Sequence, residues 1–175
     1  KKNFNLDKDN LNSFPEEWND YDSVLANPIH TNLTKFSKII KHGKKILIKN
    51  PFLFFNKKNI TIKVHFDMYH GHGNLDKAID FLKIEDREKF RAYVNTETIF
   101  NPYNMFICKS KKVLFDYYSS LFPWLEDCEN IFGFDLENSY GKKRIYGFLA
   151  ERYLSYWFKN YANPISWPVH FQDIS

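Results

Sequence analysis

Cysteine and glycine are scarce in this sequence, and their scarcity excludes several classes of protein. The chain has two cysteines and six glycines among 175 residues. Cys108 and Cys128 fall in separate predicted elements without CxxC spacing, which argues against a zinc site and against a disulfide framework. No glycine-rich phosphate loop and no Ser-His-Asp order occurs. We therefore expect a protein of a reducing, cytoplasmic compartment.

Long apolar runs are also missing. The longest apolar clusters, at residues 51–55 and 121–125, fall far short of the roughly 20 residues that span a bilayer. The charged N-terminus lacks the apolar centre of a signal peptide. We expect neither an integral membrane protein nor an exported one.

Arginine is the third scarce residue. The 25 basic residues comprise 21 lysines and four arginines, set against 21 acidic residues, for a net charge of +4. Proteins that read nucleic acids rely on the bidentate arginine fork, so we expect no nucleic-acid partner. The lysine run at positions 38, 41, 44, 45 and 49 is typical of a solvated face; the alternative is contact with anionic lipid, which implies peripheral membrane association.

Aromatic residues are abundant, and they indicate a folded chain. Phe, Tyr and Trp make up 19% of the sequence and hydrophobic residues 43%, which is too apolar for a disordered segment. The length fits a single domain over residues 1–175. We expect a polar lead-in over residues 1–19 and a C-terminal tail over 161–175.

The residue patterns predict alternating strands and helices, and hence an α/β fold. Strands are expected at residues 21–26, 45–49, 60–66 and 103–108. Helices are expected at 31–40, from Asn74 onward, around Phe90, from the N-cap Ser110 through residue 125 with a kink or break at Pro123, and at 144–160. The last of these is apolar on nearly every side, so we expect it to be the most buried helix.

Polar side chains gather where the predicted strand 60–66 meets the helix that starts at Asn74. The group consists of His65, Asp67, Tyr69, His70, His72 and Asp76. Gly71 and Gly73 predict a tight turn with outward-facing N–H groups, which suits an anionic or hydroxyl-rich ligand. Three interpretations remain open: a metal site formed by His70, His72 and Asp76, a polar ligand contact by His70, and ordinary turn histidines.

Two further groups are candidates for a site. Asn101, Tyr103 and Asn104 flank a predicted strand, either as turn residues or as amides that bind a substrate hydroxyl. Glu151 and Arg152 lie within the apolar last helix, where ionised groups need a partner or a use. Arg144 lies two turns before Glu151, so a structural ion pair on a shared face is one interpretation and a site role is the other.

Four separated segments resemble a known family. They are YHGHGNLDKAIDF at 69–81, YNMFI at 103–107, LFPWLE at 121–126 and GFLAERYL at 147–154. In order and spacing they resemble a bacterial family of capsular-polysaccharide and O-antigen glycosyltransferases, long known only as a domain of unknown function. The resemblance covers roughly residues 20–160.

The resemblance implies a GT-A-like mixed sheet with flanking helices and a hexosyltransferase activity. The enzyme would move a hexose, such as galactose or galactofuranose, from a nucleotide sugar, with a UDP-sugar expected, to a glycan or lipid-linked glycan at the inner face of the membrane. Family members carry an upstream nucleotide-binding half, so the chain resembles the acceptor-side, C-terminal part. A divalent cation, Mn or Mg, is expected in the full-length enzyme and no metal in this chain. The alternative is a non-catalytic carbohydrate-binding or assembly module.

The resemblance also selects site residues. The catalytic candidates are His70, Asp76 and Glu151, because transfer needs a base for the acceptor hydroxyl. The substrate-binding candidates are Tyr69, His72, Asn104, Met105, Trp124, Arg144 and Arg152. Tyr69 and Trp124 are expected to stack on a sugar ring, and the two arginines to bind phosphate or to pair with Glu151. We expect His70, Asn104 and Glu151 to converge on one concavity.

Overall fold

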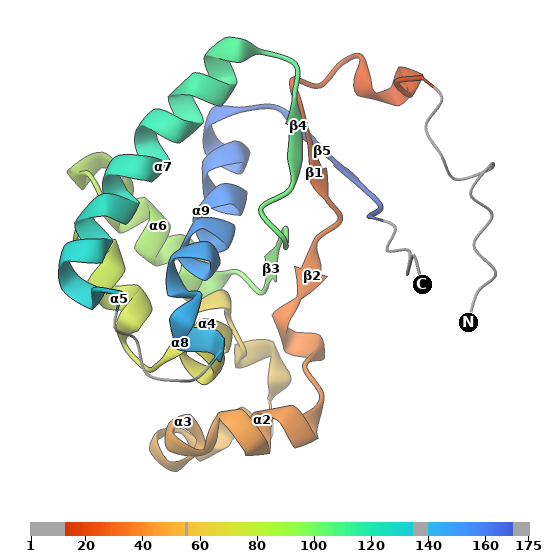
Figure 1. Cartoon of the computed structure of the whole chain (residues 1–175). Coiled ribbons are helices and arrows are strands. Elements are labelled where there is room, and N and C mark those ends of the chain that lie inside the picture. The colour runs from red at the N-terminus through yellow and green to blue at the C-terminus, as the bar shows by residue number, and fades with distance from the viewer. Residues whose placement is uncertain (1–12, 55, 135–139, 170–175) are drawn as a thin grey trace, which may run out of the picture.

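The computed structural model describes residues 13–54, 56–134 and 140–169, and it shows a mixed α/β fold in which helices cover one side of a small sheet (Figure 1). The helices are α2 (Phe36–His42), α3 (Lys44–Lys49), α4 (Ile62–His70), α5 (Asn74–Ile79), α6 (Ile84–Thr96), α7 (Lys111–Phe132), α8 (Tyr140–Lys143) and α9 (Ile145–Tyr161). Short 3-10 turns are η1 (Glu16–Trp18), η2 (Thr31–Leu33), η3 (Pro51–Phe54) and η4 (Lys57–Asn59). The strands are β1 (Ser23–Ala26), β2 (Ile29–His30), β3 (Ile99–Phe100), β4 (Phe106–Cys108) and β5 (Pro164–Trp167).

Strand β1 is the centre of the main sheet, whose order is β4-β1-β5. It pairs antiparallel with β4, with Val24 opposite Ile107, and parallel with β5, with Val24 opposite Ile165. All four β1 residues are buried, as a strand flanked on both sides requires. The strand ends before Pro28, as the sequence predicts. The segment 161–175, expected as a tail, contributes β5 to this sheet.

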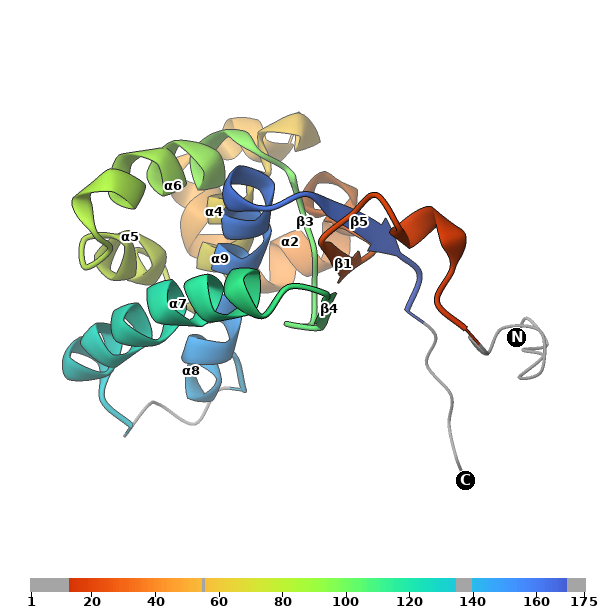
Figure 2. The ribbon, with the colours of Figure 1, turned by 90° about the horizontal axis from the view of Figure 1, so that it is seen from above.

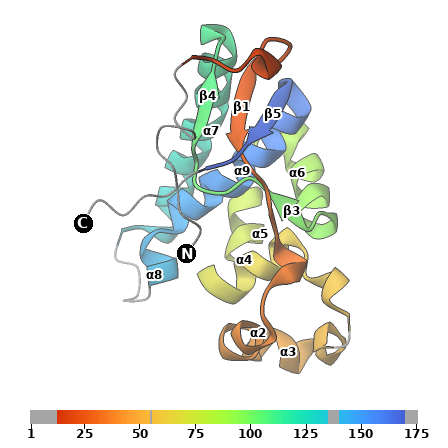
Figure 3. The same ribbon diagram turned by 90° about the vertical axis from the view of Figure 1, so that its right-hand side faces the viewer.

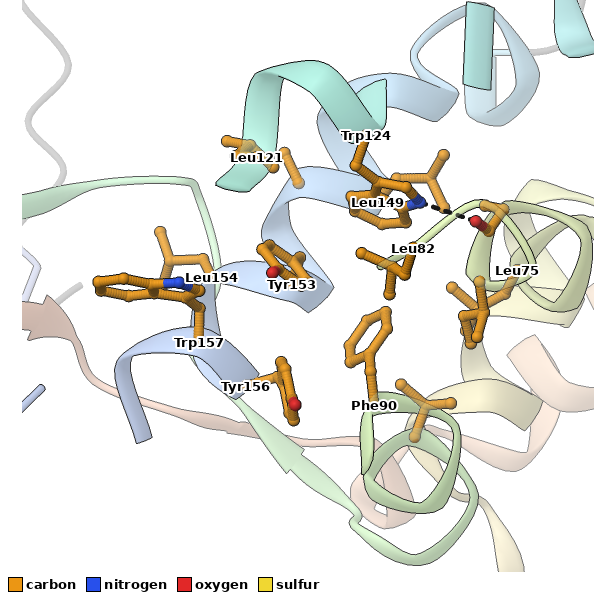
Figure 4. Packing of buried hydrophobic residues seen from close by; sticks show 14 of the residues in the cluster. Leu75, Leu82, Phe90, Leu121, Trp124, Leu149, Tyr153, Leu154, Tyr156 and Trp157 are labelled. Carbon is orange, nitrogen blue, oxygen red and sulfur yellow. Dashed lines mark hydrogen bonds between the residues drawn. The ribbon is translucent and has the colours of Figure 1, made fainter. Parts of the chain in front are cut away.

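Helix α9 runs through the core, and the prediction that it is the most buried helix is confirmed. Eleven of its residues are buried, and Phe148 and Leu149 do not form an exposed stripe. Seen from above, α9 lies between α7 on one side and α4 and α6 on the other (Figure 2). Its aromatic side chains interlock with those of its neighbours: Phe90 on α6 meets the rings of Tyr153 and Trp124 edge to face (Figure 4).

The predicted strands at 45–49 and 60–66 are wrong, because both segments are helical. Residues 44–49 form α3, and residues 62–70 form α4. Alternating β-branched residues suggested strands, but Thr61 caps α4 by accepting a hydrogen bond from Val64 N at 3.3 Å. Ile62 and Phe66, four residues apart, then point into the core together. Tertiary burial overrides the local β propensity.

Helix α7 follows the prediction at its start. The Ser110 hydroxyl accepts from Val113 N at 3.3 Å, which caps the helix as expected. The helix continues through Pro123 to Phe132, so residues 111–132 form one helix rather than two in series.

A second, smaller core lies at the end of the molecule away from the three-stranded sheet. Helices α2 and α3 lie there side by side (Figures 1 and 3). Their buried residues pack with η3 and α4 in a separate cluster, made of Ile39, Leu47, Leu53, Ile60 and Met68. Lys38 and Lys41 on α2 stay exposed. The α2–α3 unit therefore has its own apolar interior and a basic exterior.

A buried carboxylate ties α6 to α9. Asp86 accepts hydrogen bonds from the hydroxyl of Tyr156 at 2.8 Å, from that of Tyr153 at 3.2 Å, and from that of Tyr161. Burial and the neighbouring carboxylate raise the pKa of Tyr156 well above its ordinary value. Three hydroxyl groups thus depend on one acceptor.

We predict that Asp86→Ala lowers the free energy of unfolding by about 3 kcal/mol, because it leaves buried tyrosine hydroxyls without their charged acceptor. Urea denaturation measures the change. The matched control is Asp116→Ala on α7, an exposed carboxylate paired with Lys112, which should cost less than about 0.5 kcal/mol. Equal losses in the two variants would contradict the assigned role of Asp86.

Candidate functional site

The polar junction predicted from the sequence lies between α4 and α5. Helix α4 ends at His70, and the chain turns through Gly71 and Gly73, whose φ angles are 99° and 80°. Only glycine adopts such angles without strain, so the turn is built into the sequence. It returns His72 toward the last turns of α4.

Asp67 and His72 form a pair at this junction. His72 Nδ1 donates to Asp67 Oδ2 at 3.1 Å, and Gly73 N donates to Asp67 Oδ1 at 3.1 Å. Asp67 is buried, whereas His72 is exposed. With its proton on Nδ1, the imidazole presents Nε2 as an acceptor, and Lys49 Nζ lies 3.3 Å from it. A buried carboxylate that fixes the tautomer of an accessible histidine is the arrangement of an oriented base.

Lys63 neutralises the carboxylates behind this pair. Its Nζ lies 2.9 Å from Asp67 Oδ2 and 2.9 Å from Asp76 Oδ2. Burial disfavours its charge, but the hydrogen bonds to Asp67 and Asp76 outweigh burial and raise the pKa of Lys63. Asp76 also faces Arg91 Nη1 at 3.8 Å. Because two cations hold Asp76, its carboxylate serves this ion-pair network, which does not favour the catalytic role expected for it.

A hollow of about 670 Å³ opens beside the Asp67–His72 pair. We call it the junction hollow, and its lining comes from α2, α3, α4, the turn, α5 and α8: His42, Lys44, Ile46, Asp67, Met68, Tyr69, Gly71, His72, Asn74 and Lys142. Asp67 is the one carboxylate among these residues, and Lys63, His72 and Gly73 already bind it. The hollow therefore combines cations, an amide and an aromatic ring, which suits an anionic or hydroxyl-rich ligand.

His70 and His65 lie deeper than His72 and carry no charge. His70 Nδ1 donates to the carbonyl oxygen of Gly141 at 3.2 Å, and its ring stacks on Phe148 at 3.9 Å between centroids. His65 Nδ1 accepts from Arg152 Nη2 at 3.3 Å. Burial and the nearby Arg152 lower the pKa of both histidines to about 3. His70 is 5% exposed, so it positions α8 rather than acting as the base that the sequence suggested.

Glu151 and Arg152 form a buried ion pair with each other. Arg152 Nη1 donates to Glu151 Oε2, and Tyr103 N donates to Glu151 Oε1 at 2.6 Å. The guanidinium of Arg152 lies 3.7 Å from the ring centroid of Phe100. Of the two arginines considered as partners of Glu151, Arg152 forms the ion pair. Arg144 instead binds the Tyr140 hydroxyl and lies 5.7 Å from the centroid of Phe148.

The turn at Tyr103 and Asn104 is the second unusual backbone feature. Both residues have positive φ angles, 79° and 51°, which non-glycine residues seldom adopt. The bond from Tyr103 N to Glu151, together with a 2.7 Å bond from Asn104 Nδ2 to the Gly147 carbonyl, holds the turn against α9. Asn104 thus acts in local structure and also lines a separate hollow of about 230 Å³.

His70, Asn104 and Glu151 were expected to converge on one concavity. All three lie at the first turns of α9, since His70 stacks on Phe148, Asn104 donates to the Gly147 carbonyl and Glu151 is part of the helix. None of the three lines the junction hollow. Trp124 was expected to stack on a sugar; it is instead a core residue whose Nε1 donates to the Ala78 carbonyl at 2.7 Å (Figure 4). Met105 lines a separate, apolar hollow together with residues of β1, β4 and η1.

Tyr69 and His72 are the two predicted site residues that the structure brings together in the junction hollow. Sequence reasoning missed His42, Lys44 and Lys142, which come from three other helices. Asp67 was noted but not assigned a role; its spacing of five residues from His72, with Gly71 between them, was the available signal.

The His, Cys, Asp and Glu side chains decide whether a metal ion could bind. Within residues 13–54, 56–134 and 140–169, no group of three His, Cys, Asp or Glu side chains is arranged to hold a metal ion. His70, His72 and Asp76, one interpretation of the sequence, each bind a different partner. Asp20 and Asp22 flank Tyr21 in a DxD spacing. Asp22 Oδ2 accepts from Asn163 N at 3.0 Å, which ties the start of β1 to the approach of β5.

Comparison with known proteins gives one match. The model of a family described as a domain of unknown function (DUF4422) matches residues 15–163. No curated protein and no solved structure matches the chain. Across the part of the chain that the structure describes, no helix combines the length and the apolar character needed to cross a bilayer.

The low pKa values of His65 and His70 predict a pH dependence of stability. Both groups have a pKa near 3 when folded and near 6.5 when unfolded, so the unfolded chain binds more protons between these values. Stability should therefore fall as the pH drops through this window, by about 2 kcal/mol per histidine between pH 7 and 5. Urea denaturation at several pH values measures it. His70→Gln should remove about half of this loss.

Gly141 on α8 lies against the end of α4, where a side chain larger than hydrogen would clash. A Cβ there would overlap the carbonyl oxygen of Tyr69 and lie 3.1 Å from His70 Nδ1, whereas a Cβ at Gly147 would meet nothing within 4 Å. We expect Gly141→Ala to destabilise the fold by about 1–3 kcal/mol. Gly147→Ala, inside α9, should be neutral or stabilise by up to about 1 kcal/mol. Thermal unfolding of the two variants, followed by circular dichroism, separates these signs; a neutral Gly141→Ala would disprove the close packing of α8 on α4.

Proposed function

The chain belongs to the DUF4422 family, and from the geometry of the junction hollow together with the resemblance of its motifs we propose that it is the acceptor-side part of a glycosyltransferase. The reaction would move a hexose from a nucleotide sugar, a UDP-sugar in the first instance, to a hydroxyl of a bacterial surface glycan or lipid-linked glycan. The motifs at 69–81 and 147–154 supply the likeness, and the site geometry supplies the chemistry.

The observation that carries the proposal is the Asp67–His72 pair at the wall of the junction hollow. Glycosyl transfer needs a base that removes the proton of the acceptor hydroxyl. His72 has the position for this task, since its Nε2 is an acceptor and its Nδ1–H is held 3.1 Å from a buried carboxylate. Lys49 Nζ, 3.3 Å from Nε2, marks the place from which a hydroxyl would donate.

In the proposed step, His72 Nε2 takes the proton of the acceptor hydroxyl. The hydroxyl oxygen forms a bond to the anomeric carbon, while the nucleoside diphosphate leaves with the electron pair of the broken C–O bond. Asp67 stabilises the imidazolium that forms. We assign the base to His72 rather than to His70, Asp76 or Glu151. His72 is exposed at the hollow, whereas His70 and Glu151 are buried and Asp76 is paired with two cations.

The wall of the hollow supplies binding groups for such a substrate. Tyr69 presents a ring on which a sugar can stack, and Asn74 presents an amide whose Nδ2 already donates to the His70 carbonyl. Lys44 and Lys142 bring positive charge to the same hollow from α3 and α8. These groups favour a ligand that carries both hydroxyl groups and a phosphate.

The β4-β1-β5 sheet would be part of a GT-A-like sheet in the complete enzyme, and a divalent cation, Mn or Mg, would assist the leaving diphosphate there. Among the described residues, no group of three side chains is arranged to hold such a cation. The site of action would be the cytoplasmic face of the membrane.

A carbohydrate-binding or assembly module without catalysis is the second candidate. The hydroxyl-binding groups of the hollow favour it as much as they favour the enzyme. The two candidates differ in the use of His72: a module needs it for contact at most, while the enzyme needs its Nε2 in the rate-limiting transfer.

We predict that the complete gene product transfers hexose from a panel of UDP-sugars and that His72→Gln lowers kcat by about 100-fold or more with little change in KM, because glutamine cannot take up the proton. Release of UDP and glycan mass measure the reaction. His30→Gln, an exposed histidine on β2, should retain full activity.

Lys44→Ala extends this test to binding. It should raise KM and leave kcat within about threefold, because it removes charge from the wall without touching the base. Glycan binding without turnover would favour the module instead, and an active His72→Gln variant would disprove the role of the base.

A further inference from the structure

The positive charge of the chain is concentrated in one continuous segment. Residues 23–66 contain nine lysines and no Asp or Glu. The rest of the sequence holds the remaining 16 of the 25 basic residues together with all 21 acidic residues. The net charge of +4 thus hides a strongly basic segment joined to an acidic remainder.

The same segment exposes large apolar side chains. Leu33 and Ile48 are 74% and 82% exposed, and Phe52 is 72% exposed. Ile40 on α2 is 41% exposed, although its neighbour Ile39 is buried in the second core. Four exposed apolar residues within a lysine-rich segment need an explanation, because exposed apolar surface often marks a place where another surface binds.

These residues occupy one end of the molecule. Helices α2 and α3, with η2 and η3 beside them, lie at the end away from the three-stranded sheet in both side views (Figures 1 and 3). Lys35, Lys38, Lys41, Lys44 and Lys49 are all exposed there. We call this surface, formed by residues 33–52, the basic end.

We propose that the basic end docks on the surface of an anionic lipid bilayer. Lysines near an anionic surface are attracted to it within about a Debye length, ~8 Å at physiological salt. Exposed Ile48, Phe52 and Leu33 would insert at the level of the headgroups, as the apolar residues of interfacial helices do. The lysines and the apolar side chains have separate roles: the positive charge attracts the basic end to the bilayer, and the apolar contact stabilises the bound state.

A nucleic acid is the other polyanion that lysines attract, and the composition of the basic end disfavours it. The segment 23–66 contains no arginine, the residue that binds phosphates and bases bidentately. Aliphatic side chains such as Ile48 and Leu33 have no partner on a phosphodiester backbone, whereas a bilayer offers hydrocarbon. The observations therefore favour lipid.

The docking would bring the junction hollow close to the bilayer. His42 and Lys44, which line the hollow, belong to the same two short helices that carry Ile40 and Ile48 outward. This arrangement does not depend on the reaction proposed above, since a bilayer binds the basic end whether or not the hollow is catalytic.

Co-sedimentation of the chain with vesicles tests the proposal. Vesicles of equal parts phosphatidylglycerol and phosphatidylcholine should bind the chain at about 0.15 M salt, and vesicles of phosphatidylcholine alone should not. Lys38→Glu/Lys41→Glu should weaken the partition coefficient more than tenfold. Ile48→Ser/Phe52→Ser, at two exposed sites, should weaken it as well, because the apolar contact is lost.

Two matched variants control for a general effect of net charge and for a general loss of exposed apolar surface, and circular dichroism controls for misfolding. Lys83→Glu/Lys89→Glu changes the net charge equally at exposed positions outside the basic end, and Phe115→Ser/Phe122→Ser removes two exposed aromatic residues from α7. Both should bind like the parent chain, with circular dichroism spectra unchanged in all four variants. Equal weakening by the two lysine pairs, absence of binding to anionic vesicles, or tighter binding to a DNA oligonucleotide than to these vesicles would each overturn the proposal.

Discussion

Burial of the Arg152 charge is the constraint on which much of this structure depends. The side chain lies in the core, fully enclosed, and burial lowers the pKa of Arg152 while Glu151 opposes that shift. A buried guanidinium is tolerated only with an anion and with polarisable neighbours. Glu151 supplies the anion and Phe100 the ring. Glu151 in turn holds the Tyr103 N–H, so the strained turn before β4 is fixed by the same ion pair.

The charge of Arg152 also acts on the histidines of α4. Burial first, and then the nearby Arg152, lower the pKa of His65 and His70 and keep both neutral, and a neutral His70 can keep its single proton on Nδ1. That proton bonds the Gly141 carbonyl and anchors α8, the helix that carries Lys142 into the junction hollow. The ion pair in the core is thus connected, through one histidine and one glycine, to the wall of the candidate site.

The sequence predicts those elements whose local signals agree with their burial. Strand β1, the Ser110 cap and the apolar helix α9 are examples, because each depends on residues next to one another. The strand prediction for residues 60–66 was wrong. The alternating β-branched residues favour a strand, but the Thr61 cap and the packing of Phe66 in the core favour a helix. The sequence predicts the site residues at the α4–α5 junction, Tyr69 and His72, but not those that other helices contribute. His42 and Lys142 reach the hollow from helices far apart in sequence, and periodicity carries no information about such contacts.

The α2–α3 unit suggests why the junction hollow and the basic end occur together. It supplies His42 and Lys44 to the hollow, and it also carries exposed lysines and Ile48. Residues 23–66 contain no carboxylate, while the rest of the sequence has an acidic excess. Such a separation of charge orients a protein in an external field, so that an anionic surface attracts one end and repels the other. A substrate held at that surface by its own anionic or lipid part would then meet the hollow in a fixed orientation. Part of its translational and rotational entropy would already be lost at the membrane, so binding in the hollow would cost less entropy.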